Sequence, residues 1–235
     1  MQLIVITGAS RGIGKAIAVR FAREGWNMAI CSRDKADISR VSAQLSGINP
    51  SIRMLAVQAD LSRAEEAKAF GKRVVSEAGV PDLLVNNAGI FFPGTIYGEK
   101  EGVLEQLISV NLYGAYHLTR TLLPSMMSAK HGHIVNICST ASLKAYPNGG
   151  SYSISKFAFS GFSRNLREEL APFGIRVTGI YPGPVFTDSW KETGIPPDRM
   201  MAPQDVAETI WAVNQLPPGT VVEEILLRPM SGDLP

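Results

Sequence analysis

The chain has 235 residues, with 23 Lys and Arg against 21 Asp and Glu, so its formal net charge is only +2. Such a small charge does not indicate a nucleic-acid partner, and a hydrophobic share of 45% excludes a disordered chain. No apolar run approaches the roughly 18 residues that cross a bilayer. Two cysteines, Cys31 and Cys138, are too few for a disulfide framework. We therefore expect one domain over residues 1–235, located in the cytoplasm, with no membrane partner.

Short apolar runs alternate with longer amphipathic segments along the chain. In chain order we expect a strand at residues 3–7, a helix at 12–24, a strand at 26–31, a helix at 35–45, a strand at 52–58, a helix at 62–78 and a strand at 82–86. Next come a long helical segment at 99–128, a strand at 133–138, a helix at 151–171, a strand at 175–181, a helix at 204–213 and a strand at 223–227. This alternation predicts an α/β fold, a doubly wound parallel sheet of seven strands with helices on both faces.

Prolines are densest in residues 182–203, directly after the sixth predicted strand. In open parallel sheets, ligands bind outside the carboxyl ends of the strands. We therefore expect residues 184–203 to be a mobile substrate lid rather than a domain boundary.

A glycine-rich loop follows the first predicted strand and opens the first predicted helix. Its spacing is Gly-x-x-x-Gly-x-Gly, which differs from the common dinucleotide pattern Gly-x-Gly-x-x-Gly. Glycines permit a tight turn and close approach of the backbone to a pyrophosphate, and the helix N-terminus offers free N–H groups to the anion. No Gly-Lys-Ser/Thr follows, which excludes a Walker A loop. The loop therefore predicts a nucleotide site formed by Gly8, Ser10, Arg11, Gly12, Ile13 and Gly14.

The end of the second strand often distinguishes NAD from NADP, because an acidic residue there binds the ribose hydroxyls and an arginine accommodates a 2′-phosphate. Here the chain continues as Ser32, Arg33 and Asp34, and no carboxylate occupies the strand end. Arg33 and Arg11 could each form a charge-assisted bond to the phosphate, worth roughly 1.5–3 kcal/mol. Asp34 also fits as the N-cap of the next helix, and Arg33 as a solvated surface residue. The pair of arginines favours NADP(H).

Tyr152 and Lys156 lie four positions apart in a predicted helix and therefore share one face. A nearby ammonium group favours the phenolate and is expected to lower the tyrosine pKa towards neutrality. Tyr152 could then exchange a proton with a carbonyl oxygen, and Ser139, at the end of the fifth strand, could hydrogen-bond the same oxygen. Taken alone, the pair is equally compatible with an exposed structural contact on a helix.

These motifs occur together in a known family. The chain resembles the short-chain dehydrogenases/reductases over nearly its whole length, which implies a Rossmann-like fold. The matching positions are residues 7–14, Asp60, residues 86–89, Asn111, Ser139, Tyr152, Lys156 and residues 182–183.

The resemblance implies a role for each catalytic position. Tyr152 would be the general acid/base, Lys156 would bind the nicotinamide ribose and lower the Tyr152 pKa, and Ser139 would polarise the carbonyl. Asn111 would hold a helix kink and a water that links Lys156 to solvent. Ser142 is a nearby alternative to Ser139, but Ser139 lies 13 positions before Tyr152, the usual gap in the family.

The resemblance also implies the remaining coenzyme contacts. Asp60 and Leu61 would contact the adenine. Asn87, Ala88 and Gly89 would shape the groove. The nicotinamide end would be flanked by Pro182, Gly183, Val185 and Thr187.

Aromatic side chains surround the expected substrate position: Phe91, Tyr146, Phe186 and Trp190. They predict a small apolar or planar carbonyl substrate, although each could be ordinary packing. No metal site is expected, because His131 and His133 have no visible third ligand. Apolar positions on several faces of residues 99–128 and 151–171 indicate a partner surface, and the resemblance implies a homodimer or homotetramer.

The main prediction is an NADPH-dependent oxidoreductase that reduces a carbonyl to an alcohol. Residues 221–235 resemble the subgroup that includes bacterial sepiapterin reductases and short-chain alcohol dehydrogenases, so a pterin side-chain reductase is one alternative. A 3-oxoacyl carrier-protein reductase is another, which this ending disfavours. A non-catalytic NADP-binding sensor is an alternative of a different class, against which the set of Ser139, Tyr152 and Lys156 argues. A methyltransferase is disfavoured by the phosphate loop.

Overall fold

The computed structural model describes residues 1–188 and 194–232. Within this part of the chain, one seven-stranded parallel sheet has the order β3-β2-β1-β4-β5-β6-β7. The strands are β1 (Leu3–Thr7), β2 (Asn27–Ser32), β3 (Met54–Gln58), β4 (Leu83–Asn86), β5 (Gly132–Ile137), β6 (Ile175–Pro182) and β7 (Glu224–Leu227). The predicted α/β fold, with its doubly wound parallel sheet of seven strands, is confirmed.

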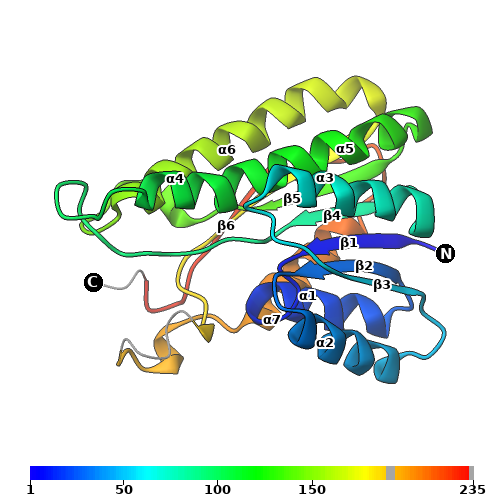
Figure 1. Ribbon diagram of the computed structural model, residues 1–235, viewed down its shortest axis with the longest axis horizontal. Coiled ribbons are helices and arrows are strands. Elements are labelled where there is room, and N and C mark those ends of the chain that lie inside the picture. The colour runs from blue at the N-terminus through cyan, green and yellow to red at the C-terminus, as the bar shows by residue number, and fades with distance from the viewer. Residues whose placement is uncertain (189–193, 233–235) are drawn as a thin grey trace.

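Helices cover both faces of the sheet (Figure 1). One face carries α1 (Gly12–Arg23), α2 (Lys35–Ile48) and α7 (Pro203–Asn214), and the other carries α3 (Ala64–Arg73), α4 (Val103–Ile108), α5 (Gly114–Ala129) and α6 (Gly150–Leu170). The alternating side chains of β1 divide between the two cores: Ile4 and Ile6 pack on the first side, and Leu3 and Val5 on the second. No helix of the described residues is both long and apolar enough to cross a membrane.

Two predicted helices are interrupted by π-helical turns. Residues 99–128 were expected to be one helix, but α4 starts only at Val103, after Gly102 in a left-handed conformation (φ 85°). A π-helical turn, Ser109–Tyr113, then separates α4 from α5. A second π-helical turn, Val74–Ala78, follows α3 and ends at Gly79 (φ 107°). Such turns interrupt the regular helix without changing the apolar pattern, so periodicity alone does not reveal them.

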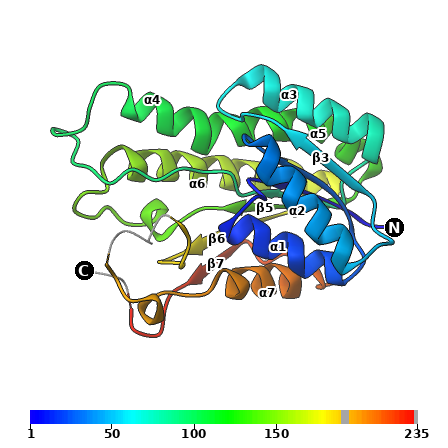
Figure 2. The same cartoon turned by 60° about the horizontal axis from the view of Figure 1, so that its bottom comes forward.

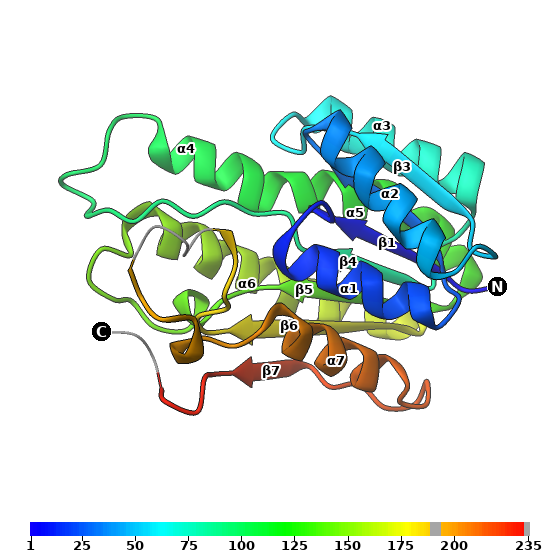
Figure 3. The same cartoon turned by 90° about the horizontal axis from the view of Figure 1, so that it is seen from below.

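The carboxyl ends of the parallel strands meet at one edge of the sheet (Figure 3). Strand order reverses between β1 and β4, the position at which doubly wound sheets bind ligands. The long segment between β4 and α4 and the segment after β6 both extend beyond this edge (Figure 2). The fold therefore brings the glycine-rich loop, the end of β5 and the start of α6 to the same side.

Candidate active site

A cleft of about 1190 Å³ lies at the carboxyl edge of the sheet. Most of the residues predicted from the sequence line it: Gly8, Ser10, Arg11, Ile13, Ser32, Arg33, Asp60, Leu61, Asn87, Ala88, Gly89, Phe91, Ser139, Tyr146, Tyr152, Lys156, Pro182, Gly183, Val185 and Thr187. Gly12, Gly14, Asn111 and Phe186 do not line it. Trp190 lies outside the described residues. The structure thus brings most of the predicted coenzyme positions, and Ser139, Tyr152 and Lys156 of the catalytic positions, into one cleft.

The glycine-rich loop presents an open helix N-terminus to the cleft. Arg11 is the N-cap of α1, and no side chain caps this helix end, so its first N–H groups are available to an anion. Gly8 and Gly12 have left-handed conformations (φ 64° and 54°). A Cβ at Gly14 would overlap the Gly8 carbonyl oxygen and lie 2.5 Å from Asn87 Nδ2, so only glycine fits there. This cradle fits a pyrophosphate.

Asn87 and Thr7 fix the glycine-rich loop to the segment after β4. Asn87 Nδ2 donates to the carbonyl oxygens of Thr7 (2.9 Å) and Gly8 (3.1 Å). Thr7 Oγ1 in turn accepts the N–H groups of Asn87 and Ala88, both at 2.9 Å. Thr187 approaches from the other side, because a Cβ at Gly12 would lie 3.2 Å from its Cγ2. The loop is therefore held in shape by the protein itself.

The end of β2 also lines the cleft, next to the glycine-rich loop. Ser32 Oγ donates to Ser10 Oγ at 3.1 Å, and Gln58 Nε2 holds the Arg33 carbonyl oxygen at 3.0 Å. Arg33 is exposed, and its guanidinium has no hydrogen bond or ion pair with the described residues. Asp34 accepts the Asp37 N–H at 2.8 Å and so caps α2, the alternative role expected for it.

The other two charged coenzyme positions have protein partners. Arg11 forms an exposed ion pair with Asp188, with 3.7 Å between Nη1 and Oδ2. The Asp60 carboxylate accepts the N–H and hydroxyl of Ser62 at 3.0 and 2.8 Å. Asp60 thereby shapes the turn before α3, and Leu61 is the neighbouring apolar surface of the cleft.

Tyr152 lies in the first turn of α6, beside Ser139. The Phe91 ring packs edge-on against the Tyr152 ring, with 4.7 Å between centroids. Ser139 Oγ accepts the Ala141 N–H at 3.1 Å and is hydrogen-bonded to Tyr152. Ser142, by contrast, is buried, does not line the cleft and accepts the Ser139 N–H at 3.2 Å. Of the two serines, only Ser139 is placed to contact a ligand.

Lys156 lies below the tyrosine, with its ammonium group directed to the protein backbone. Lys156 Nζ donates to the Ile137 carbonyl oxygen at 3.0 Å and lies 6.0 Å from the centroid of the Tyr152 ring. Burial lowers the pKa of Lys156 to about 8. Burial also raises the pKa of Tyr152 to about 12, although its hydrogen bond with Ser139 acts in the opposite direction. The lowered Tyr152 pKa expected from the sequence is not found, because desolvation outweighs the hydrogen bond with Ser139.

Asn111 supports these residues from outside the cleft. It lies in the π-helical turn Ser109–Tyr113, and its side chain accepts the Ile90 N–H (2.8 Å) and donates to the Ile90 carbonyl oxygen (3.1 Å). Asn111 Nδ2 also donates to Ser155 Oγ at 3.0 Å, and Ser155 Oγ donates to the Tyr152 carbonyl oxygen at 2.7 Å. Asn111 therefore links the helix irregularity to the backbone of Tyr152, while the expected water next to it stays a prediction.

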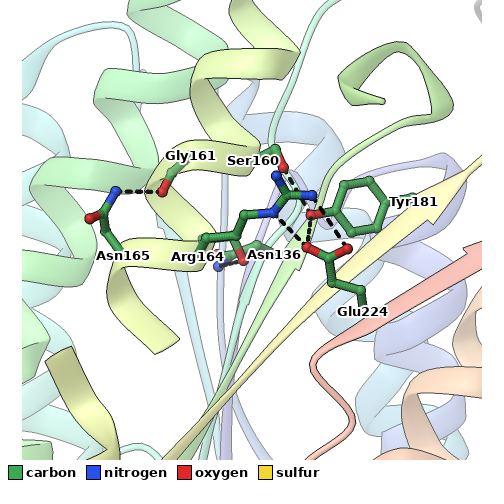
Figure 4. Close-up of polar contacts among 8 residues, drawn as sticks. Asn136, Ser160, Gly161, Arg164, Asn165, Tyr181 and Glu224 are labelled. Carbon is green, nitrogen blue, oxygen red and sulfur yellow. Dashed lines mark hydrogen bonds and ion pairs between the residues drawn. The ribbon is translucent and has the colours of Figure 1, made fainter. Parts of the chain in front are cut away.

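A polar network anchors α6 further along the helix (Figure 4). The buried Tyr181 hydroxyl of β6 is hydrogen-bonded to Ser160 Oγ (2.9 Å) and Glu224 Oε1 (3.0 Å). Arg164 Nε donates to the same Glu224 oxygen at 2.7 Å. These bonds join α6 to both β6 and β7. They fix the axis of the helix that carries Tyr152 and Lys156.

Comparison with known proteins agrees with this geometry. The model of the short chain dehydrogenase family matches residues 2–196. The chain belongs to this family.

Individual relatives of this short-chain dehydrogenase carry the names of different enzymes. A sepiapterin reductase of Chlorobaculum tepidum is 32% identical and is matched over 99% of this chain and 98% of its own length. A 3-oxoacyl-[acyl-carrier-protein] reductase of Staphylococcus aureus is 33% identical over 88% of this chain and 87% of its own. The solved alcohol dehydrogenase of the archaeon Thermococcus sibiricus, in complex with 5-hydroxy-NADP, has a TM-score of 0.91 and 29% identity, covering 100% of this chain and 99% of that one.

Some residues that line this dehydrogenase's cleft were not expected from the sequence. They belong to the segments after β5, β6 and β7: Lys144, Pro147, Asn148, Ile195 and Arg228. None stands in a short motif, so only the folded chain reveals them. Phe186, which was expected near the substrate, does not line the cleft, and its backbone N–H donates to the Met201 carbonyl oxygen.

Proposed function

We propose that this short-chain dehydrogenase is an NADP(H)-dependent carbonyl reductase with Tyr152 as its proton donor. The observation that carries the proposal is the meeting of Ser139, Tyr152 and Lys156 in one cleft that extends to the uncapped N-terminus of α1. A non-catalytic NADP-binding sensor would need only the part of the cleft that holds the nucleotide. The hydroxyl groups of Ser139 and Tyr152 suit instead a carbonyl that reacts.

The proposed coenzyme is NADP(H), the finer choice within the NAD(P) typical of the family. The α1 N-terminus would hold the pyrophosphate, and Lys156 the nicotinamide ribose. Arg33 supports a 2′-phosphate, since its guanidinium has no partner in the described part of the chain and lines the cleft where β2 ends. The complex of the Thermococcus sibiricus enzyme with 5-hydroxy-NADP adds support from a related fold.

The chemistry then follows from two hydroxyl groups. The bound coenzyme supplies the hydride. Ser139 Oγ and Tyr152 Oη would donate hydrogen bonds to the substrate oxygen as negative charge develops on it. Tyr152, which its raised pKa of about 12 keeps protonated at neutral pH, would give its proton to that oxygen. The Lys156 ammonium would offset the resulting phenolate.

The proposed substrate is a small apolar or planar ketone or aldehyde. Phe91 and Tyr146 provide flat apolar surfaces at the substrate end of the cleft. A pterin with a side-chain ketone is the second candidate, because it is planar and the sepiapterin reductase relative matches 99% of the chain. The 3-oxoacyl reductase relative matches less of it.

The wider organisation is proposed on the same basis. Residues 1–235 would form one domain, and residues 184–203 would close over the substrate, although 189–193 lie outside the described part. We also propose a homodimer or homotetramer in the cytoplasm.

A screen of NADPH oxidation tests the proposed function. The panel would contain sepiapterin, 1-phenyl-1,2-propanedione, benzaldehyde, a naphthoquinone, a ketosteroid and acetoacetyl-CoA, with NADPH binding measured separately by its fluorescence. We expect tight binding of NADPH and turnover with a diketone, aldehyde or pterin. Binding without turnover across the panel would favour the sensor, and absence of NADPH binding would contradict the coenzyme assignment.

A further inference from the structure

Glu99 joins two segments that are far apart in the sequence. It lies between β4 and α4, yet its Oε1 accepts the Ser151 N–H at 3.0 Å and its Oε2 accepts the Ser151 hydroxyl. The N-cap of α6, Gly149, has no side chain with which to cap the helix. A carboxylate at this end satisfies a free N–H group and interacts favourably with the helix dipole. Glu99 thus caps the catalytic helix from a distant loop.

Two glycines allow this approach. A Cβ at Gly150 would overlap Glu99 Oε1, and one at Gly94 would lie 2.7 Å from Glu99 Cγ. Gly150 also has a positive φ of 34°. The backbone adds a further link, because the Gly94 N–H donates to the Asn148 carbonyl oxygen at 3.0 Å. We call Gly94, Glu99, Gly150 and Ser151 the Glu99 clamp.

The Glu99 clamp lies next to the reacting group. Tyr152 directly follows Ser151, and its ring contacts Phe91, which belongs to the same loop as Glu99. On the other side of the clamp, Tyr146 and Asn148 line the cleft just before α6. The clamp therefore connects both apolar walls of the substrate end with the first turn of the helix that carries the phenol.

We propose that Glu99 is a positioning residue for the reaction. It fixes the first turn of α6, so that Tyr152 Oη meets the substrate carbonyl, and it sets the spacing between Phe91 and Tyr146. This inference rests on the proposed function for its catalytic consequence. Among the described residues, no hydrogen bond joins the clamp to the glycine-rich loop, which is held by Thr7 and Asn87. Loss of the clamp is therefore expected to affect turnover and not coenzyme binding.

The first test needs no substrate. Exchange of the Ser151 amide hydrogen is measured by NMR in the full-length wild-type protein and in Glu99→Ala. Because Glu99 is the acceptor of this N–H, exchange should become at least about tenfold faster. Glu101→Ala removes an exposed carboxylate of the same loop and should leave it unchanged. Equal exchange in Glu99→Ala and wild type would overturn the clamp.

The second test compares turnover with coenzyme affinity. With the best carbonyl of the panel, Glu99→Ala should lower kcat by about tenfold or more, the loss expected for a charged hydrogen bond, with the NADPH Kd within about twofold of wild type. Glu99→Gln can keep both contacts with Ser151 and should restore most of the rate. Equal rates in Glu99→Ala and Glu101→Ala, or a matching loss of NADPH affinity, would contradict the positioning role.

Two further comparisons keep the outcomes separate. If Glu99→Ala does not fold, Ser151→Ala removes only the hydroxyl contact and should lower kcat by about threefold; an unchanged rate would then count against the proposal. If none of the carbonyls in the panel supported NADPH oxidation by the wild-type protein, the proposed function would be contradicted. Exchange of the Ser151 amide hydrogen would still decide whether the clamp exists.

Discussion

The two halves of the cleft are built in different ways. The half proposed to hold the coenzyme consists of tight turns after β1, β2 and β4, held by hydrogen bonds of Thr7 and Asn87 to neighbouring backbone groups and by glycines that leave no room for a side chain. The half proposed to hold the substrate is formed by longer segments after β4, β5 and β6 that carry side chains such as Glu99, Phe91 and Tyr146. This difference fits the finding that relatives about 30% identical carry the names of different oxidoreductases. The coenzyme class can be transferred from a relative more safely than the substrate.

After the loss of the Tyr152 hydroxyl, the largest effect is expected where the halves meet, at Ser139. Removing one donor to a developing oxyanion typically costs 10²–10³ in kcat, so Ser139→Ala should lower kcat by roughly several hundredfold with an unchanged NADPH Kd. Ser142→Ala, which affects only the Ser139 N–H, should lose far less. Steady-state kinetics and fluorescence titration measure both. If the two variants lost equal activity, the choice of Ser139 would be wrong.

A Cβ added to the glycine-rich loop is expected to weaken NADPH binding. Gly14→Ala places a Cβ against Gly8 and Asn87 and should raise the NADPH Kd about a hundredfold, as overpacking of roughly 3 kcal/mol would. Gly47→Ala is the control, because a Cβ there meets nothing within 4 Å. NADPH fluorescence titration measures both. Comparable affinities of Gly14→Ala and Gly47→Ala would show that the loop is not the pyrophosphate site.

Coenzyme choice is expected to depend on Arg33. Loss of one charge-assisted bond of about 2 kcal/mol should raise the KM for NADPH in Arg33→Ala about thirtyfold, and the KM for NADH by less than about twofold. Arg23→Ala, at the far end of α1, controls for overall charge. Initial rates with each coenzyme measure the ratio. Equal changes for both coenzymes would remove the argument for NADP(H).

The smallest expected effect concerns the pH dependence of folding stability, and it should change neither half of the cleft. Burial lowers the pKa of His133 to about 4, from the ordinary 6.5 of the unfolded chain. Its stability contribution is complete above pH 6.5 and is lost as the pH falls towards 4, because the unfolded state binds the proton first. At pH 5.5 the loss is about 1.4 kcal/mol. Urea denaturation of His133→Gln should show a flatter acid decline, whereas the exposed His131→Gln should decline as wild type does.

Particular elements show how far the sequence predicts this molecule. The seven strands and the Tyr152–Lys156 pair follow from local patterns, and Ser139 and the glycine-rich loop from short motifs. The π-helical turn around Asn111 does not follow from local patterns, because residues 99–128 keep a helical apolar pattern throughout; only the family resemblance implies a kink there. The raised Tyr152 pKa was missed, because burial depends on tertiary packing. Glu99 was missed for the same reason, since its partner Ser151 is 52 positions away.

The most direct test of the central claim is the Tyr152→Phe variant, measured for NADPH oxidation and NADPH binding side by side. Phenylalanine keeps the ring that packs on Phe91 and removes only the hydroxyl that would give the proton. The account predicts an NADPH Kd within about twofold of wild type and a rate lower by about a thousandfold, within the usual range for general acid catalysis. A variant that kept more than about a tenth of the wild-type rate would contradict it.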